Sequence, residues 1–516
     1  MSLHFPGLAI FGRRGVKSEN GEQALAFVAT ITSMTLDSAT CYRALRARDA
    51  RFDGRFFVAV SSTRIYCRPV CTVKPPKREN CRFYPSAAAA ESGGYRPCLR
   101  CRPELAPGNA SVDAVSRLAQ AAASLIEDRT LDADGLDAVA ARLGITDRHL
   151  RRAFGAEFGV SPVEFAQTQR LLLAKRLLTD TGLPVTEIAF ASGFGSLRRF
   201  NALFKQRYRL QPGQLRRHMR AATSPAADAL NFELSFRPPY DWPAVGAFLG
   251  ARAIAGVEML EGGCYRRTVR IAQEGKEHLG WVEVALSAKK PALRVAVSPS
   301  LARVLPPVLS RVKALMDLAC NPAEVAQALG ALAKGHPGVR VPGAFDGFEV
   351  AVRAILGQQV SVAAARTVAG RFAEAFGDPV DTPFAALNRI FPAAERIAGL
   401  PYGRIARLGM PGARARTVLA LARAVADGEL DLVPNADIEA TLDKLRALPG
   451  VGEWTAQYIA MRSLAWPDAF PHTDLGVMKA LGMKDAKHVL AAGEAWRPWR
   501  AYAVMHLWNS LAKDRP

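Results

Sequence analysis

The spacing of apolar residues predicts that the chain changes architecture along its length. Between residues 111 and 220 apolar residues recur at helical intervals, as Leu136, Val139, Ala140 and Leu143 do. After residue 230 they alternate over short runs. This alternation predicts strands over residues 231–236, 264–271, 280–286 and 293–297 and helices over residues 242–249 and 301–319. From residue 321 to the end the spacing is helical again. We therefore expect an all-α segment, then a small α+β subdomain, then a second all-α segment.

Within the first helical segment one arrangement of helices occurs twice. In the first copy a helix leads through Gly144 into the basic stretch Asp147-Arg148-His149-Leu150-Arg151-Arg152. In the second copy residues 185–194 precede residues 197–205, and a long helix from Pro162 to about Leu178 lies between the copies. A helix, a short turn containing glycine and a second helix with basic residues form a helix-turn-helix signature.

The duplicated unit resembles the AraC-type DNA-binding domain over nearly all of residues 112–220. The resemblance includes its ending, Tyr208-Arg209-Leu210-Gln211-Pro212-Gly213. In that family both second helices enter successive major grooves. The resemblance implies DNA contacts from Thr146, Arg148, His149, Arg151, Arg152, Ser196, Arg198, Arg199 and Asn201. Each of these side chains alone could equally belong to a solvated helix face.

Charge and length support a DNA-binding protein of several domains. The 516 residues include 68 Lys and Arg against 47 Asp and Glu, a formal net charge of +21, which favours a polyanionic partner such as nucleic acid. The length suggests about three or four domains. No apolar run approaches the roughly 20 residues of a membrane span, and the first 34 residues lack a signal peptide's apolar stretch. We expect a cytoplasmic protein associated with the nucleoid.

The cysteines are concentrated near the N-terminus. Cys67-x3-Cys71 and Cys98-x2-Cys101 are two close pairs, a spacing that lets four thiolates surround one Zn²⁺. The alternative is a set of unrelated buried thiols, which is what we expect of Cys41 and Cys81. Between residues 41 and 105 there are 14 Arg and Lys against 5 Asp and Glu, so this segment should face phosphate.

This N-terminal segment resembles the zinc domain of the Ada-type methylation-response regulators. The resemblance is carried by Arg64-Ile65-Tyr66-Cys67-Arg68-Pro69-Val70-Cys71, Glu79-Asn80-Cys81-Arg82-Phe83-Tyr84 and Tyr95-Arg96-Pro97-Cys98-Leu99-Arg100-Cys101. It implies that Cys67 is both a ligand and the nucleophile that takes a methyl group from a DNA methylphosphotriester. Cys71, Cys98 and Cys101 are then the remaining ligands. Methylation removes a negative charge beside DNA, so the methylated domain should bind DNA more tightly.

The C-terminal half contains a glycine turn and an isolated acid. In Leu448-Pro449-Gly450-Val451-Gly452-Glu453-Trp454 the glycines lead into a helix and leave backbone N–H groups open to an anion such as a DNA phosphate. Asp474 follows in the mostly apolar stretch Phe470-Pro471-His472-Thr473-Asp474-Leu475.

Together with Arg353-Ala354-Ile355-Leu356-Gly357-Gln358-Gln359-Val360-Ser361 and Trp496-Arg497-Pro498-Trp499-Arg500, these stretches resemble the helix-hairpin-helix DNA glycosylases, specifically the 3-methyladenine DNA glycosylase II group. The resemblance covers about residues 231–510. It implies that Asp474 is the catalytic acid and that Gly450 and Gly452 form the hairpin on DNA. Trp454, Tyr458 and Trp508 then wall the base pocket, although aromatic residues at such spacing can also be core. Gln359 stands where relatives insert an apolar wedge into the duplex.

Three absences refine the expected chemistry. Trp454 occupies the position of the Schiff-base lysine of bifunctional relatives, so we expect a monofunctional glycosylase without lyase activity. No cysteine follows Cys320, so we expect no iron–sulfur cluster. The chain has no Pro-Cys-His-Arg sequence, so we expect no direct repair of O6-alkylguanine.

The predicted organisation is a multidomain fusion. It comprises a leader (1–36), a small α+β zinc domain (37–107), an all-α double helix-turn-helix domain (110–220), a linker (221–230), an α+β subdomain (231–320) and an all-α helix-hairpin-helix glycosylase domain (321–516).

The expected function is methylphosphotriester sensing with transcriptional activation, joined to excision of N-alkylated purines. The expected partners of this monomer are double-stranded, alkylated and promoter DNA and RNA polymerase, and no membrane. Two alternatives remain open: a transcription regulator whose C-terminal half binds without catalysis, and a glycosylase with a passive DNA-binding arm.

Overall fold

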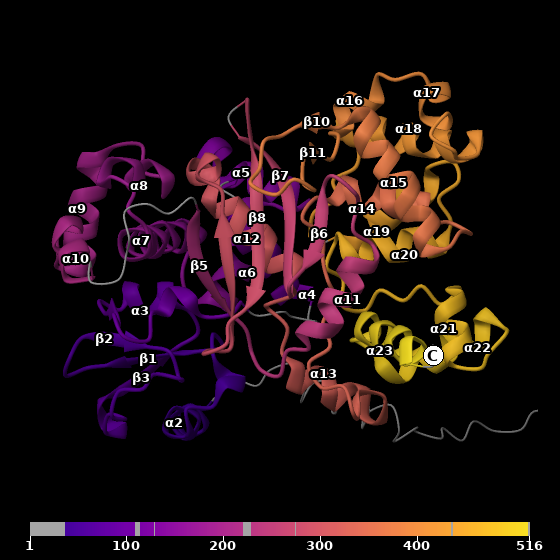
Figure 1. Ribbon diagram of the computed structural model, residues 1–516. Helices are drawn as coiled ribbons and strands as arrows, with labels where there is room; N and C mark the ends of the chain where they lie inside the picture. The colour runs from indigo at the N-terminus through magenta and orange to yellow at the C-terminus, as the bar shows by residue number, and fades with distance from the viewer. Residues whose placement is uncertain are drawn as a thin grey trace, which may run out of the picture.

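The computed structural model describes residues 37–108, 114–127, 130–219, 229–273, 275–434 and 437–513. The leader predicted over residues 1–36 and most of the linker predicted over residues 221–230 lie outside them. Three modules follow one another along the chain and pack together, with a five-stranded sheet in the middle of the molecule (Figure 1).

The N-terminal module is a small sheet covered by short helices. Its elements are α2 (Ser38–Ala47), β1 (Phe57–Val60), β2 (Ile65–Cys67), β3 (Cys81–Tyr84), α3 (Ala87–Ser92) and β4 (Arg96–Pro97). The strand order is β3-β1-β2-β4, and β2 and β4 run parallel. Alternate residues of β1 face opposite sides, because Val58 packs with the α2 residues Cys41 and Leu45 whereas Ala59 packs with Ala90 of α3. The predicted α+β fold is confirmed.

The described part of the second module consists of seven helices. They are α4 (Ala114–Glu127), α5 (Thr130–Arg142), α6 (Asp147–Phe158), α7 (Pro162–Asp180), α8 (Val185–Ala191), α9 (Leu197–Tyr208) and α10 (Pro212–Met219). Both helix-turn-helix units are present as α5–α6 and α8–α9, and in each turn a glycine, Gly144 or Gly193, has a positive φ. Thr146, Ser161 and Ser196 cap the following helices through their hydroxyl groups.

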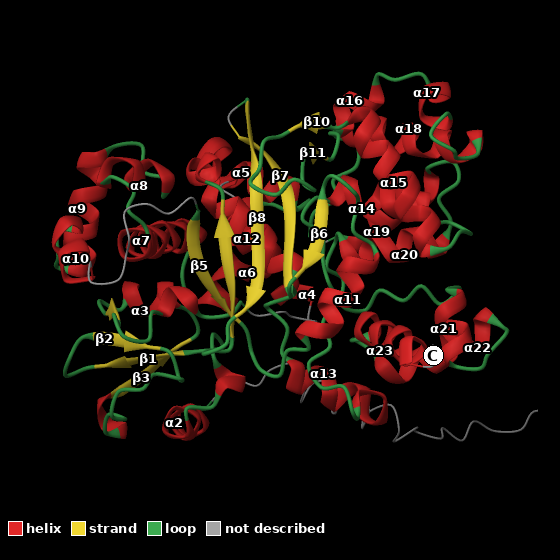
Figure 2. Ribbon diagram, in the orientation of Figure 1, coloured by secondary structure: helices red, strands yellow, loops and turns green. Residues whose placement is uncertain are grey.

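The third module begins with an antiparallel sheet of order β5-β9-β8-β7-β6. The strands are β5 (Leu230–Ser235), β6 (Glu258–Glu261), β7 (Cys264–Gln273), β8 (Lys276–Leu286) and β9 (Ala292–Val297), accompanied by α11 (Trp242–Ala251) and α12 (Leu305–Leu315). Figure 2 shows the sheet with helices on both sides. The sequence pattern predicted four of these strands and missed β6. The helix predicted over residues 301–319 is shorter, because α12 starts at Leu305 and a 3₁₀ turn, Pro299–Val304, precedes it.

The rest of the third module is mainly helical, as predicted. It contains α13 (Pro322–Leu329), α14 (Gly347–Leu356), α15 (Val362–Phe376), α16 (Ala394–Ala398), α17 (Tyr402–Ala406), α18 (Gly412–Ala426), α19 (Ile438–Ala447), α20 (Glu453–Arg462), α21 (Leu475–Ala480), α22 (Ala486–Gly493) and α23 (Arg500–Lys513). A pair of two-residue strands, β10 (Asp378–Pro379) and β11 (Arg389–Ile390), is an addition to the prediction. Among the described helices, none combines the length and apolar character that crossing a membrane requires.

Candidate active site, zinc centre and DNA-contact surfaces

Asp474 is fixed by three hydrogen bonds at the N-terminus of α21. As the N-cap residue it accepts a hydrogen bond at Oδ1 from the backbone N–H of Val477, at 2.9 Å. The indole N–H of Trp454 donates to Oδ2 at 2.8 Å, and the indole N–H of Trp508 donates to Oδ1 at 2.9 Å. Three helices, α20, α21 and α23, therefore meet at one carboxylate. Both of its oxygens act as acceptors, and its orientation is set by groups far apart in the sequence.

Four aromatic rings line up beside this carboxylate. Trp454 and Tyr458, one turn apart on α20, stack with ring centroids 5.3 Å apart. Tyr458 lies 6.3 Å from Trp508, and Trp508 stacks on Phe248 at 6.2 Å. The structure thus brings the three predicted pocket residues together. It adds Phe248 from α11, whose role the sequence pattern did not reveal because it lies more than 200 residues away from α20 in the chain.

Two arginines border the aromatic rings. Arg462 donates from Nη1 to the hydroxyl of Tyr458 at 2.8 Å, and its guanidinium lies over the ring of Phe248 at 4.8 Å. Arg252 lies over the same ring at 3.9 Å. Burial tends to raise the pKa of Tyr458, but the positive charges of Arg462 and Arg252 outweigh it, so this pKa is lowered. The sequence analysis missed both arginines.

The predicted hairpin connects α19 to α20. Gly450 has a φ of +82°, and a Cβ at this position would lie 2.3 Å from Oγ1 of Thr417 on α18, so only glycine fits. Gly452 is the N-cap residue of α20, and a Cβ there would meet no atom within 4 Å. Its lack of a side chain is therefore not required by the packing of the described residues, and it leaves the helix N-terminus open to an incoming anion.

The loop after α14 is attached to this hairpin. Gln358 donates from Nε2 to the carbonyl oxygen of Gly450 and to Oγ1 of Thr455, both at 2.9 Å. Arg414 of α18 donates to the carbonyl oxygen of Gln358 at 2.6 Å. The next residue, Gln359, is exposed and has a φ of +54°. The predicted wedge residue thus lies on a loop attached to the hairpin, and Gln358 is an anchoring residue that the sequence analysis did not single out.

The four predicted zinc ligands come together in the N-terminal module. The sulfur atoms of Cys67, Cys71, Cys98 and Cys101 lie within 4.8 Å of one another. A tetrahedral site with Zn–S bonds of about 2.3 Å has sulfur atoms about 3.8 Å apart, so the set fits a zinc ion. Among the described residues no other group of three or more Cys, His, Asp or Glu has this arrangement.

The local fold explains why the two cysteine pairs meet. Cys67 ends β2, and Cys98 follows β4, and these strands are parallel, with Tyr66 opposite Pro97. Their carboxyl ends therefore lie side by side, and the N–H of Cys98 donates to the carbonyl oxygen of Tyr66 at 3.0 Å. The backbone N–H of Arg68 points at the sulfur of Cys101 at 3.4 Å. Cys41 and Cys81 lie together in a separate apolar cluster, as expected of thiols that are not ligands.

The predicted contact residues of the helix-turn-helix units lie mainly on the surface. Arg148, His149, Arg151 and Arg152 are exposed on α6, and Arg151 pairs with Asp147 at 2.8 Å. On α9, Arg198 and Arg199 are exposed and Asn201 is half-buried. Thr146 and Ser196, also exposed, are the N-cap residues of these two helices. The basic side chains are therefore available to DNA on both second helices.

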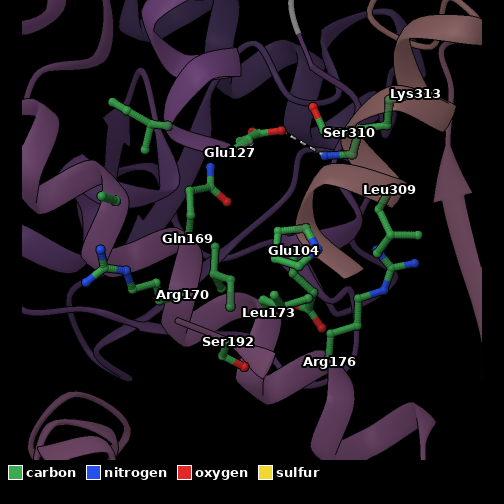
Figure 3. Close-up of a pocket in the computed structure, with 14 residues that line it drawn as sticks. Glu104, Glu127, Gln169, Arg170, Leu173, Arg176, Ser192, Leu309, Ser310 and Lys313 are labelled. Atoms are coloured by element: carbon green, nitrogen blue, oxygen red, sulfur yellow. Dashed lines mark hydrogen bonds and ion pairs between the residues drawn. The ribbon is translucent and has the colours of Figure 1, made fainter. Parts of the chain in front are cut away.

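A small cavity of about 90 Å³ lies elsewhere, between α7 and α12 (Figure 3). Glu104, Gln169, Arg176, Ser192 and Lys313 are among the residues that line it. None of the residues around Asp474 borders this cavity, so it belongs to the junction between modules and not to the candidate active site.

Comparison with known proteins gives a family for each part of the chain. The model of the metal binding domain of Ada matches residues 40–104, and that of a helix-turn-helix domain matches residues 139–218. The model of the AlkA N-terminal domain matches residues 231–346, and that of the HhH-GPD superfamily base excision DNA repair proteins matches residues 352–488. These domains support Zn²⁺ as the metal of the four-cysteine site and DNA as the partner.

Relatives match the chain over nearly its whole length or over part of it. A probable bifunctional transcriptional activator/DNA repair enzyme AlkA from Mycobacterium tuberculosis is 40% identical over 490 residues, which cover 92% of this chain and 97% of that protein. DNA-3-methyladenine glycosylase 2 from Escherichia coli is 35% identical over 54% of this chain and 96% of its own length. The bifunctional transcriptional activator/DNA repair enzyme AdaA from Bacillus subtilis is 30% identical over 34% of this chain. Since the first similarity extends over nearly the entire length of both proteins, the chain belongs to the AlkA family of bifunctional transcriptional activator/DNA repair enzymes.

Proposed function

We propose that the third module excises N-alkylated purines of the 3-methyladenine type from DNA by hydrolysis. The observation that carries the proposal is the Asp474 carboxylate, held by two indole N–H groups and a backbone N–H beside four aromatic rings. An alkylated purine is cationic and leaves easily, so an electron-rich pocket binds the base. The fixed carboxylate stabilises the positive charge that develops on the sugar or orients the attacking water.

The absence of a lysine beside the hairpin supports a monofunctional enzyme. Trp454 stands two residues after Gly452, and its indole is already bonded to Asp474. This position therefore has no amine that could form a Schiff base with the sugar. We expect an intact abasic strand as the product, which alkali but not the enzyme cleaves.

Substitution of Asp474 tests the catalytic assignment. Asp474→Asn should lower the rate of 3-methyladenine release by at least about a hundredfold, because the acceptor that faces the sugar loses its charge, while the melting temperature changes little. Asp485→Asn is the matched control, since Asp485 is the exposed N-cap residue of the neighbouring helix α22. An Asp474→Asn enzyme that excises at the wild-type rate would refute the assignment.

We also propose that Cys67 accepts one methyl group from a DNA methylphosphotriester. Its support is the four-sulfur cluster at the end of β2, on a module rich in basic residues. Zinc keeps such thiolates deprotonated near neutral pH. The sulfur of Cys67 bonds to the methyl carbon while the bond from that carbon to the phosphate oxygen breaks, and the electron pair stays on the phosphate as a diester anion.

The methyl transfer is tested by mass spectrometry of the protein after incubation with methylated duplex DNA. One methyl group on the Cys67 peptide is expected for the wild type and for Cys81→Ser, and none for Cys67→Ser. A methyl group on another cysteine, or none on the wild type, would contradict the proposal.

We further propose that this monomeric, cytoplasmic protein activates transcription after methylation, through α6 and α9 on promoter DNA and with RNA polymerase as partner. The exposed arginines on both helices support it. Methylated protein should bind promoter DNA more tightly than unmethylated protein, because the zinc cluster has lost a negative charge. If the two forms bind promoter DNA with equal affinity at several salt concentrations, the activation proposal is wrong. The protein is then a glycosylase with a passive DNA-binding arm.

A further inference from the structure

Three buried charged side chains and one half-buried arginine lie together between the five-stranded sheet and α14. Glu258 comes from β6, Arg267 from β7, and Glu349 and Arg353 from α14. Arg267 and Arg353 each donate to a different oxygen of Glu349 at 2.6 Å, and Arg353 also bonds to Glu258. The two acids balance the two guanidinium groups. Burial opposes ionisation of Glu258, but the charges of Arg353 and Arg267 prevail and lower its pKa to about 2.

Within this cluster, Arg353 holds the end of α11. Its Nη1 donates to the carbonyl oxygen of Arg252, the residue after the last turn of α11, at 2.9 Å. Glu258, bonded to the same guanidinium, accepts the backbone N–H of Ile254 at 3.2 Å. Tyr265 donates its hydroxyl proton to the other oxygen of Glu258. Arg353 and its acid thus attach the segment from Arg252 to Ile254 to α14 by hydrogen bonds.

This segment forms part of the candidate base pocket. Arg252 covers one side of the ring of Phe248, and Phe248 stacks on Trp508, which is bonded to Asp474. A shift of the α11 end therefore moves the ring against which Trp508 packs. The pocket wall from α11 and the wall from α20 and α23 belong to different subdomains, so their separation depends on what joins these subdomains.

The C-terminal end of α14, where Arg353 lies in the last turn, leads to the DNA-facing loop. After Leu356 the chain reaches Gln358, whose amide is bonded to Gly450 and Thr455 of the hairpin region. α14 therefore connects the hairpin, the loop with Gln359 and the α11 wall of the pocket. Buried ion pairs add little net stability compared with well-packed apolar residues, yet their directional bonds define geometry. The four-residue cluster gives α14 one fixed position relative to the sheet.

We propose that Arg353 is a positioning residue of the glycosylase, which sets the α11 wall of the base pocket against Trp508 and Asp474. The inference rests on the glycosylase function proposed above. It assigns to Arg353 no contact with the base. An error of about 1 Å in the placement of reacting groups can lower a rate by up to about a hundredfold, so loss of this arginine should affect excision without affecting the hairpin.

The test compares Arg353→Met with Arg353→Lys in the full-length protein. Single-turnover release of 3-methyladenine should fall about tenfold in Arg353→Met, and free 3-methyladenine should bind more weakly as an inhibitor. The affinity for undamaged duplex should stay at the wild-type value, since Gln358 and the hairpin are unchanged. Arg353→Lys keeps a cation near the acids and should recover part of the rate.

Arg266→Met is the matched control. Arg266 lies next to Arg267 on β7 and pairs with Glu283 at 2.5 Å, away from α14. Its rate and base affinity should equal those of the wild type, and its melting temperature should fall less than that of Arg353→Met, because the Arg266–Glu283 pair is more exposed than the two acids of the cluster. The inference is overturned if Arg353→Met matches the control in rate and base affinity, or if Arg353→Lys is no better than Arg353→Met.

Tyr265→Phe is the second test variant, to be used if Arg353→Met does not fold. This substitution removes one hydrogen bond to Glu258 and keeps all four charges of the cluster. It should lower the excision rate about threefold and weaken inhibition by the free base, and wild-type values for both would overturn the inference. Binding of the free base needs no turnover. A wild-type protein that binds the base but releases none would refute the proposed glycosylase function and leave the positioning role testable.

Discussion

At the scale of single residues, Glu91 is a buried carboxylate between the zinc module and α9. Only 2% of it is exposed. Tyr66, the neighbour of Cys67, donates to Oε1 at 3.0 Å, and Tyr208 of α9 donates to the same oxygen at 3.4 Å. Burial raises the pKa of Glu91 to about 8, although the Tyr66 bond and the positive charges of Arg207 and Lys175 oppose the shift.

This raised pKa predicts a pH-dependent stability. Folded protein keeps the Glu91 proton up to about pH 8, whereas the unfolded chain releases it near its usual value of 4.5. The free energy of unfolding should therefore fall as the pH rises between these values, by at most about 1.4 kcal/mol per unit. Glu91→Gln should remove this slope in urea unfolding of the zinc-loaded protein. Glu79→Gln, an exposed residue of the same module, is the control, and a slope that persists in Glu91→Gln would contradict the prediction.

Residues with distinctive chemistry were the ones that sequence alone could predict. The four cysteines have a ligand spacing, and the structure brings their sulfur atoms together. Asp474 is the one acid in the stretch from Phe470 to Leu475, and its catalytic role stays a prediction. Phe248, Arg252 and Gln358 gave no such signal. Their roles depend on partners about 90 or more residues away, such as Trp508 for Phe248 and Gly450 for Gln358. No local pattern encodes such contacts.

At the scale of elements, the two hairpin glycines should respond differently to alanine. Gly450→Ala puts a Cβ 2.3 Å from Thr417 at a positive φ, so we expect a loss of stability of about 1–3 kcal/mol. Gly452→Ala meets no atom and has an ordinary φ of −94°, so its melting temperature should stay near that of the wild type. Its DNA affinity should still fall several-fold, because the added methyl group stands where a phosphate approaches.

Thermal unfolding and duplex binding, measured on both variants, check this pair. A Gly452→Ala protein that is destabilised, or that binds DNA as tightly as the wild type, would argue against an open helix N-terminus on the DNA side. A Gly450→Ala protein with wild-type stability would argue against the close contact with Thr417.

The periodicity of apolar residues predicted helices and strands well where one face of a segment is buried. It predicted short edge strands and the ends of helices less well. Helix α7 and strands β5, β7 and β9 start within one residue of the predicted positions, whereas β8 starts at Lys276, four residues before the predicted strand. β6 was missed because it is four residues long, begins and ends with Glu, and pairs at the edge of the sheet. The helix expected from residue 301 begins at Leu305, since Pro306 and Pro307 lack an N–H and are tolerated in the first turn of a helix.

At the scale of the whole molecule, a charged network joins the zinc module to the other two. Lys175 of α7 pairs with Glu104 at 2.6 Å, and both side chains are at least 97% buried. Arg102, which follows the predicted ligand Cys101, bonds to Asp180 at 2.8 Å and to Glu104 at 3.0 Å. Next to Lys175, Arg176 donates to the carbonyl oxygen of Glu233 on β5 at 2.6 Å. The network borders the cavity of Figure 3 and reaches from the zinc site to the central sheet.

Loss of Glu104 should uncouple the zinc module. In Glu104→Gln the ammonium group of Lys175 stays buried without its acid, and breaking a buried pair in this way costs about 3–5 kcal/mol. This loss of stability arises at the junction between the modules, and the cores of the modules are unchanged. Zinc release, followed with a coloured chelator during heating, should coincide with the main unfolding transition in the wild type. In Glu104→Gln it should precede that transition.

Excision activity distinguishes the uncoupling of the zinc module from damage to the whole protein. Asp474 and its three donors lie outside the network, so excision by Glu104→Gln at 25 °C should equal that of the wild type, and Glu79→Gln should match the wild type in both assays. If zinc release still coincides with unfolding in Glu104→Gln, the zinc module is joined to the rest by apolar contacts, for which the core that packs Ala88 and Ala89 of α3 against α4–α7 is the candidate. If excision is lost together with zinc, the network supports the active site as well, and the zinc sensor and the glycosylase share one folding unit.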